Sequence, residues 1–214
     1  MHVAAIVVAA GAGERFGARK QFADVDGRTV AELAVASARS IASQVVLVAP
    51  PDALDQAHGA DLVVAGGATR SASVRAGLAV IDADADVVVV HDAARPFASP
   101  ALFLAVVAAL DALAADGAVP GIAVTDTIKV LAAGEDPVIV DTLDRASLVA
   151  VQTPQAFVAA VLRRAHEGDP DATDDAALVE AIGARVVVVA GEATNRKITT
   201  PEDLASARAA RVRR

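Results

Sequence analysis

Residues 3–17 read VAAIVVAAGAGERFG, a short apolar run that ends at a loop with three glycines. The run is apolar throughout rather than alternating, which is typical of a strand buried on both faces of a parallel sheet. Five similar runs follow, at Val45–Val48, Leu62–Ala65, Val87–Val90, Ala118–Val124 and Arg185–Ala190. The opening segment therefore predicts the first strand of a parallel sheet, with a glycine loop at its carboxyl end.

Helical patterns separate these runs, at Val30–Ile41, Ser73–Ile81, Pro100–Ala115, Ala156–His166 and Asp174–Ile182. The alternation predicts a doubly wound, mostly parallel, Rossmann-like α/β sheet with helices on both faces. A last helix is expected after Thr200, whose hydroxyl can cap it, with Pro201 in the first helical position. The length of 214 residues fits one domain, 1–214, better than two small ones.

The segment at about 127–151 interrupts the alternation. Thr127–Leu131 and Val138–Val140 are extended runs joined by a Gly134–Pro137 turn, which predicts a hairpin. An isolated hairpin is only marginally stable in water, and a second subunit is one source of cover for its apolar face.

Composition excludes several classes of protein. A net charge of −8 and 2% aromatic residues argue against a nucleic-acid binder. The absence of cysteine excludes a disulfide framework, a thiolate metal site and a cysteine nucleophile. The longest apolar run, Ala101–Leu110, is too short to span a membrane, and no basic region precedes the first apolar run. We therefore expect a cytoplasmic protein with no membrane partner.

The glycine loop is the first of four features expected at the carboxyl ends of strands, where open α/β sheets bind ligands. Its pattern G-x-G-x-x-x-G, at Gly11, Gly13 and Gly17, is neither a P-loop nor a dinucleotide fingerprint. Successive backbone N–H groups there can cradle an anion, and Arg15 and Lys20 add the positive charge that a triphosphate needs. The alternative is an ordinary loop with solvated charges.

Two further features follow later strands. After Gly66-Gly67, Ser73 either reaches a ligand or caps the next helix, and the cap is favoured. In the segment HDAARP, Asp92 ends a buried strand, where a carboxylate is costly without a positive partner. Mg²⁺ is one candidate partner and Arg95 is the other; we favour the functional role. For His91 we expect a structural hydrogen-bonding role.

The fourth feature is a scattered set of hydroxyl, carboxylate and cationic side chains, at Asp126-Thr127, Asp144-Arg145, Thr153–Gln155, Thr173-Asp174 and Asn195–Lys197. These groups suit a phosphorylated polyol, although each taken singly is more often a cap, a turn or a solvated face.

Taken in order, the segments AAGAGERFG, KQF, GGATRSASV, HDAARP, DTIK, DR, TPQAF, TDDA and NRKIT-x-PEDL, from residue 9 to residue 204, resemble the 2-C-methyl-D-erythritol 4-phosphate cytidylyltransferases of the non-mevalonate isoprenoid pathway. The resemblance implies that CTP and 2-C-methyl-D-erythritol 4-phosphate become 4-diphosphocytidyl-2-C-methyl-D-erythritol and pyrophosphate, with Mg²⁺. A phosphate oxygen of the sugar phosphate would attack the α-phosphorus of CTP, and pyrophosphate would leave in line.

The resemblance also implies roles for particular residues. The catalytic cations would be Arg15, Lys20, Arg145 and Lys197. The nucleotide would lie among Ala10, Gly11, Gly13, Gly67, Ser73 and Asp92, and Asp92 is also the possible metal ligand. The sugar phosphate would be held by Arg95, Thr127, Arg145, Thr153, Thr173 and Lys197. In the family the hairpin arm reaches the partner's site, which implies a homodimer with composite sites.

Two departures from the family pattern leave alternatives open. Arg19 stands where the family usually has proline, so either Lys20 or Arg19 is the loop cation, and Ala72 replaces a residue that is commonly acidic or an amide. A ribitol-5-phosphate cytidylyltransferase is the nearest alternative, less favoured because of Ala10 and Ala94. A non-catalytic nucleotide-binding regulator is a second, and an NAD-binding dehydrogenase is disfavoured by the glycine spacing.

Overall fold

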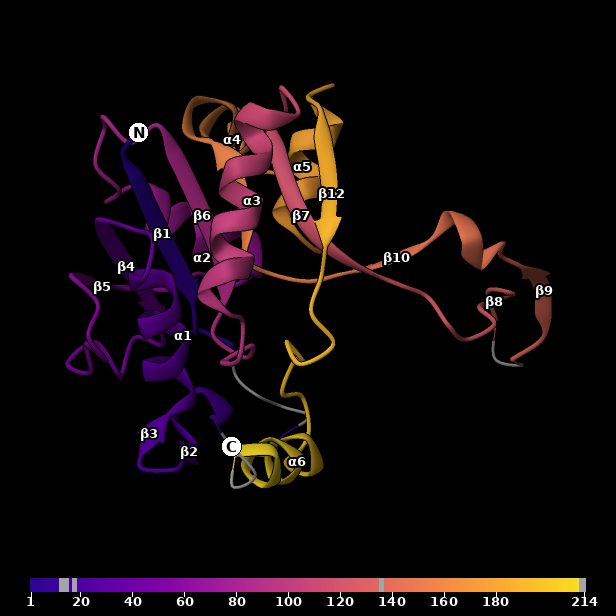
Figure 1. Ribbon diagram of the computed structural model, residues 1–214, viewed down its shortest axis with the longest axis horizontal. Helices are drawn as coiled ribbons and strands as arrows, with labels where there is room; N and C mark the ends of the chain where they lie inside the picture. The colour runs from indigo at the N-terminus through magenta and orange to yellow at the C-terminus, as the bar shows by residue number, and fades with distance from the viewer. Residues whose placement is uncertain (12–15, 17–18, 135–136, 212–214) are drawn as a thin grey trace.

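One mixed β-sheet runs through the computed structural model (Figure 1). The structure describes the chain except for residues 12–15, 17–18, 135–136 and 212–214. The strands follow the order β10-β7-β11-β6-β1-β4-β5, and β12 pairs with β7. Their bounds are β1 Val3–Val8, β4 Gln44–Ala49, β5 Leu62–Ala65, β6 Val87–Asp92, β7 Gly117–Ala123, β10 Val149–Val151, β11 Gln155–Val158 and β12 Val186–Ala190.

All six apolar runs form strands of this sheet, so the predicted fold class is confirmed. β1 pairs in parallel with both β4 and β6, and β12 pairs in parallel with β7. Side chains of β1 alternate between two core clusters, with Ala5 and Val7 in one and Ala4 and Ile6 in the other. Because both clusters are buried, the strand needs apolar residues at every position.

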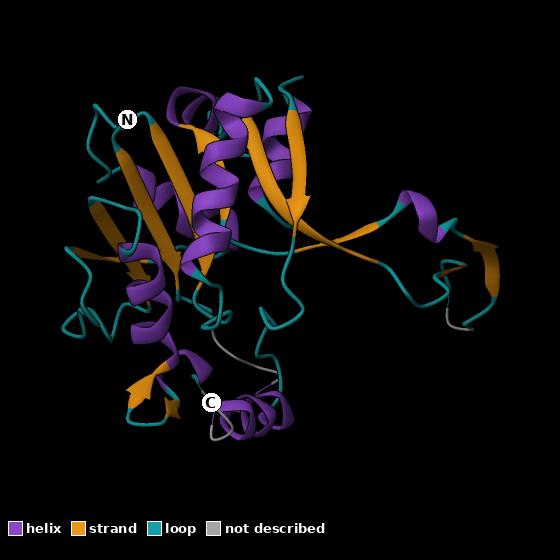
Figure 2. Ribbon diagram, viewed as in Figure 1, coloured by secondary structure: helices purple, strands orange, loops and turns teal. Residues whose placement is uncertain are grey.

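Helices cover both faces of the sheet, as the alternating pattern predicts (Figure 2). The core cluster on one face includes residues of α1 (Val30–Arg39) and α3 (Pro100–Ala112). The cluster on the other includes residues of α2 (Arg70–Leu78), α4 (Ala159–Ala165) and α5 (Asp175–Ala181).

The prediction of a helix over Ala156–His166 was wrong at its start. Gln155–Val158 forms β11, which lies antiparallel between β6 and β7. Ala156 and Phe157 are fully buried there. A four-residue apolar segment carries no period that separates strand from helix, so only its place in the sheet decides.

The expected hairpin is present and forms an arm that projects from the body (Figure 1). Its strands are β8 (Lys129–Leu131) and β9 (Ile139–Thr142), followed by the short 3-10 helix η3 (Arg145–Ser147). The arm exposes a set of large apolar side chains: Ile128, Leu131, Val138, Ile139, Val140 and Leu143.

A third cluster lies below the sheet, around the helix α6 (Pro201–Arg211). It joins α6 and α1 to the two-stranded hairpin of β2 (Asp24–Val25) and β3 (Arg28–Thr29), beside the 3-10 helix η2 (Lys20–Phe22). The Thr200 hydroxyl accepts a hydrogen bond from Asp203 N at 3.3 Å, so the predicted cap is confirmed. None of the helices in the described ranges has the length and apolar character needed to cross a bilayer.

Gly77 in α2 lets that helix approach β1 closely. A Cβ atom at this position would lie 2.7 Å from Cγ2 of Ile6, a fully buried residue. Replacing glycine by alanine inside a helix ordinarily stabilises it by about 1 kcal/mol. Overpacking a core costs about 1–3 kcal/mol, so the clash should outweigh the helical gain.

We therefore expect Gly77→Ala to lower the free energy of unfolding, measured by urea denaturation. The same substitution in an Ile6→Ala background is the control, because the clashing atoms are then absent. A loss of equal size in both backgrounds would contradict contact with Ile6 as its cause.

Candidate functional site

A cavity of about 430 Å³ opens at the carboxyl ends of β1, β5 and β6. It is lined by backbone and small side chains after each of these strands, and by a few polar groups: Val8, Ala9, Ala10, Gly11, Lys20, Gln21, Gly67, Ala68, Thr69, Arg70, Ser73, Asp92, Ala93, Ala94 and Lys197. We call this the strand-end cavity. A larger hollow of about 710 Å³ beside α6 also includes Lys197, but neither Asp92 nor the glycine segments line it.

The parallel pairing of β1 and β6 places the acidic group of the strand-end cavity. Val8 is the register partner of Asp92, so the carboxylate emerges beside Ala9, Ala10 and Gly11. On the other side, a Cβ added at Gly66 would lie 2.2 Å from the Ala10 Cβ. Only glycine allows the segment after β5 to approach the segment after β1 this closely, and Ala10 and Gly67 of these two segments line the cavity.

Two cations hold Asp92. Its Oδ1 lies 3.2 Å from Arg70 Nε, and its Oδ2 lies 2.7 Å from Lys197 Nζ. Burial opposes ionisation of this carboxyl, but the charges of Arg70 and Lys197 outweigh it and hold its pKa well below the usual range. Asp92 is therefore a buried anion with both oxygens paired.

The alternative of an Asp92–Arg95 ion pair is wrong. The Arg95 guanidinium instead donates to the backbone carbonyls of Asn195 at 2.8 Å and Val151 at 3.3 Å. Burial lowers the pKa of Arg95. Its side chain fastens the loop after β6 to two neighbouring segments rather than orienting Asp92.

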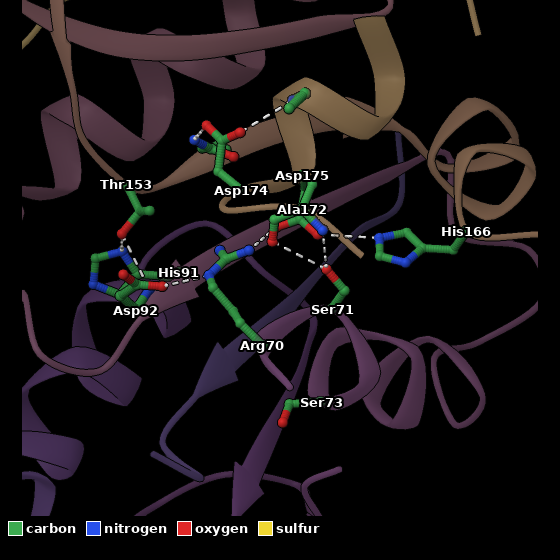
Figure 3. Close-up of polar contacts among 12 residues, drawn as sticks. Arg70, Ser71, Ser73, His91, Asp92, Thr153, His166, Ala172, Asp174 and Asp175 are labelled. Atoms are coloured by element: carbon green, nitrogen blue, oxygen red, sulfur yellow. Dashed lines mark hydrogen bonds and ion pairs between the residues drawn. The ribbon is translucent and has the colours of Figure 1, made fainter. Parts of the chain in front are cut away.

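Arg70 is the charged partner that sequence analysis missed. It lies at the start of α2 and joins Asp92 to Asp175, whose Oδ2 lies 2.7 Å from Arg70 Nη1 (Figure 3). Burial alone would lower the pKa of Arg70, yet the two carboxylates raise it. Nothing in the segment GGATRSASV distinguishes this arginine from a solvated one. Its partners lie 22 and 105 residues away in the chain.

The expected structural role of His91 is confirmed. The ring is fully buried, with Nε2 3.1 Å from the Arg95 carbonyl and Nδ1 3.0 Å from the Thr153 hydroxyl. A carbonyl only accepts, so Nε2 carries the proton and Nδ1 accepts from Thr153. Thr153 in turn accepts from the backbone N–H of Asp92 at 3.0 Å. Thr153, predicted to contact substrate, thus supports Asp92 from behind and does not line the strand-end cavity.

Lys20, and not Arg19, lines the strand-end cavity. Arg19 forms an ion pair of 2.7 Å with Asp52, and both side chains are largely exposed. Gln21, which sequence analysis passed over, is buried and donates to the Gly11 carbonyl at 3.2 Å. The predicted residues Gly13 and Arg15 lie outside the described residues.

The favoured capping role of Ser73 is wrong, because α2 begins at Arg70 and Thr69 caps it. The Ser73 hydroxyl lies one turn later and donates to the Thr69 carbonyl at 2.9 Å. It also accepts from Gly67 N at 3.2 Å, and so fixes the glycine segment that lines the cavity.

Three other predicted residues lie away from the strand-end cavity of their own chain. Thr127 and Arg145 belong to the arm, where Arg145 Nη1 donates to the Thr125 carbonyl at 2.6 Å. Thr173 is exposed in the loop before α5. Within a single chain, the cavity therefore brings together Ala10, Gly11, Lys20, Gly67, Ser73, Asp92 and Lys197 from the predicted set.

Known proteins match nearly the whole chain. The family model for 2-C-methyl-D-erythritol 4-phosphate cytidylyltransferase matches residues 3–213. The enzyme of that name from Rhodococcus jostii is 46% identical, over 97% of this chain and 94% of the relative. A bifunctional enzyme IspD/IspF from Nitrobacter winogradskyi is 48% identical over 94% of this chain, which spans about half (53%) of that relative's length.

Solved structures agree. The crystal structure of 2-C-methyl-D-erythritol 4-phosphate cytidylyltransferase from Thermus thermophilus superimposes with a TM-score of 0.81 and 39% identity, covering 97% of this chain and 98% of the other. The 4-diphosphocytidyl-2C-methyl-D-erythritol synthase from Anaerococcus prevotii gives a TM-score of 0.83 at 32% identity, covering 100% and 99%.

The buried histidine predicts a pH dependence of stability. Burial lowers the pKa of His91 to about 4, below its ordinary value of 6.5. Between about pH 6.5 and pH 4 the imidazole therefore binds a proton in the unfolded chain but not in the folded chain. The free energy of unfolding falls as the pH falls through that window. The slope should reach at most about 1.4 kcal/mol per pH unit.

We expect His91→Gln to remove this contribution, so that its unfolding free energy falls less steeply than that of the unmodified chain between about pH 6.5 and pH 5. Urea unfolding over that range compares the two slopes, which is independent of any constant loss caused by the substitution. Parallel curves would contradict the assignment to His91.

Proposed function

The chain belongs to the 2-C-methyl-D-erythritol 4-phosphate cytidylyltransferase family, and on this premise we propose that it transfers a cytidylyl group from CTP to 2-C-methyl-D-erythritol 4-phosphate. The products are 4-diphosphocytidyl-2-C-methyl-D-erythritol and pyrophosphate. The observation that carries the proposal is a cavity that combines bare backbone with Lys20, Lys197 and Asp92. The proposal also takes the enzyme to act in the cytoplasm on small nucleotides rather than on nucleic acid, which a net charge of −8 favours.

The reaction joins two anions, so its main demand on the protein is electrostatic. A phosphate oxygen of the sugar phosphate attacks the α-phosphorus of CTP, and the bond to pyrophosphate breaks on the opposite side. Such transfers need positioning and charge stabilisation rather than a protein nucleophile. We assign neutralisation of the triphosphate to Arg15 and Lys20, and binding of the sugar phosphate to Lys197, which lines the cavity.

The small residues have a separate task. Ala10, Gly11 and Gly67 present backbone groups to the cavity without side chains that would fill it. The Ser73 hydroxyl already holds Gly67 N in place. We propose that this wall reads the cytosine and ribose, because backbone donors and acceptors can approach a ligand only where side chains are small.

The donor set fits Mg²⁺ that arrives with the nucleotide better than a resident ion. Of the described residues that line the strand-end cavity, Asp92 is the one carboxylate, and both its oxygens face cations. A candidate three-ligand cluster among the described residues, His2 with Asp82 and Asp84, lies at the opposite ends of the strands and is largely exposed. Mg²⁺ commonly takes one or two protein carboxylates plus phosphate oxygens and water. When bound, it would offset charge on the triphosphate.

We further propose that two subunits share each site. The arm carries Thr127 and Arg145 away from their own cavity and exposes apolar side chains such as Leu131 and Ile139. An apolar surface of this kind is typical of a protein contact. An arm that lies on a second subunit would cover that surface and bring the Arg145 cation to the partner's sugar phosphate.

The first test is a two-substrate assay of pyrophosphate release. We expect release only when CTP and 2-C-methyl-D-erythritol 4-phosphate are both present, since no single anion can act as donor and acceptor. Other nucleoside triphosphates and ribitol 5-phosphate are the controls. Equal or faster turnover with ribitol 5-phosphate would transfer the assignment to the ribitol enzyme, and nucleotide binding without turnover would indicate a regulator.

The second test mixes two inactive variants. Asp92→Asn damages the cavity and Arg145→Ala damages the arm, so a mixed dimer holds one site with both elements intact. We expect activity to return after subunit exchange, to about one site in four if exchange is random. Exchange verified by mass spectrometry without any recovery would contradict shared sites.

A further inference from the structure

A continuous series of polar side chains, joined by hydrogen bonds and ion pairs, runs behind the strand-end cavity. His166 Nε2 lies 3.0 Å from Asp175 Oδ1, and Asp175 Oδ2 lies 2.7 Å from Arg70 Nη1. Arg70 Nε then reaches Asp92, which also holds Lys197. Figure 3 shows the part from His166 to Asp92, with Arg70 between the two carboxylates.

The side chains of this series become more buried with distance from the strand-end cavity. The His166 side chain is 3% exposed and that of Asp175 is 0%, whereas Lys197 is 40% exposed. A buried carboxylate without a cation would be strongly destabilised, so Asp175 fixes where the guanidinium can lie. Asp175 and His166 do not line the strand-end cavity, and Arg70 links them to it through Asp92.

The two carboxylate oxygens of Asp92 are held by cations of different rigidity. Lys197 is a flexible, half-exposed ammonium that a phosphate group can attract away. Arg70 is planar, and its fork binds two carboxylates in fixed directions. Backbone contacts reinforce it: the Ser71 hydroxyl donates to the Ala172 carbonyl at 3.3 Å, and Ala172 N donates back at 3.2 Å. These bonds keep α2 and the segment before α5 together.

We propose that Arg70 is a positioning residue for the cytidylyl transfer, and that Asp175, backed by His166, locks its guanidinium. When substrate draws Lys197 from Asp92, Arg70 keeps the carboxylate ionised and aimed into the cavity. This inference rests on the proposed function, because it assigns Asp92 a task during the reaction.

The experiment compares the unmodified chain with Arg70→Gln, Arg70→Lys, Asp175→Asn and the double variant Arg70→Gln/Asp175→Asn. Arg75→Gln is the matched control: Arg75 lies on the same helix, pairs with Asp169 at 3.0 Å and donates to the Pro170 carbonyl at 2.7 Å, but makes no polar contact with Asp92 within the described chain. Steady-state kinetics gives kcat and KM for each substrate, and thermal unfolding confirms that each variant is folded at the assay temperature.

We expect Arg70→Gln to lower kcat/KM for CTP by at least about tenfold, with the KM for the sugar phosphate changed less than about twofold. Arg70→Lys should remain well below the unmodified chain, because one ammonium cannot bridge both carboxylates. Asp175→Asn should cause a smaller loss, and should add nothing in the double variant. A crystal structure of Arg70→Gln should show the Asp92 carboxylate turned from its position while β6 stays in place.

Three results would overturn the inference. They are a kcat/KM for CTP in Arg70→Gln within about twofold of that of the unmodified chain, losses of kcat/KM that multiply in the double variant, and an equal loss of kcat/KM in Arg75→Gln. Failure of the unmodified chain to release pyrophosphate would instead overturn the proposed function. In that case the crystal structure of Arg70→Gln still decides whether Arg70 holds Asp92.

Discussion

The parallel ladder between β1 and β6 is the constraint on which the molecule depends. Its register sets Val8 opposite Asp92, so the strand that feeds the glycine loop ends beside the strand that ends in a carboxylate. Both strands are buried on both faces, and this fixes their side-chain composition. A shift by one residue would exchange the two core clusters and move Asp92 away from the bare wall of the cavity.

The buried Asp92 carboxylate at the end of this ladder is stable because cationic side chains lie directly beside it. The chain as a whole is acidic, with 27 Asp and Glu residues against 19 Lys and Arg. Within the site, Arg70 and Lys197 balance Asp92 and Asp175 pair by pair. These four charges therefore balance within the site, while the acidic surface gives the chain no general attraction for polyanions.

Sequence patterns predict periodic elements such as strands and helices well, but they predict contacts between residues distant in the chain poorly. Continuous apolar runs gave the six strands, and the order of short motifs gave the residues around the cavity. The strand β11 was not predicted, because Gln155–Val158 is too short to show a period and its antiparallel position depends on the space between β6 and β7. The ion pair of Arg70 and Asp175 was not predicted, because residues 105 positions apart in the chain give no local sequence pattern. Arg19 and Lys20 are adjacent cations, and only the fold shows that Asp52 holds the first. The partner subunit and Mg²⁺ stay predictions.

The root of the arm has a consequence for protein engineering. β7 leads out to the arm and β10 leads back, and Val149 lies opposite Ala123 in antiparallel register. The two ends of the appendage are thus already neighbours within the sheet. A short turn closing this gap would excise the outer hairpin as a module, leaving Gln152, Thr153 and β11 in their native connection to β7. The body and its appendage are in this sense separable parts, joined by two adjacent strands rather than by a packed interface.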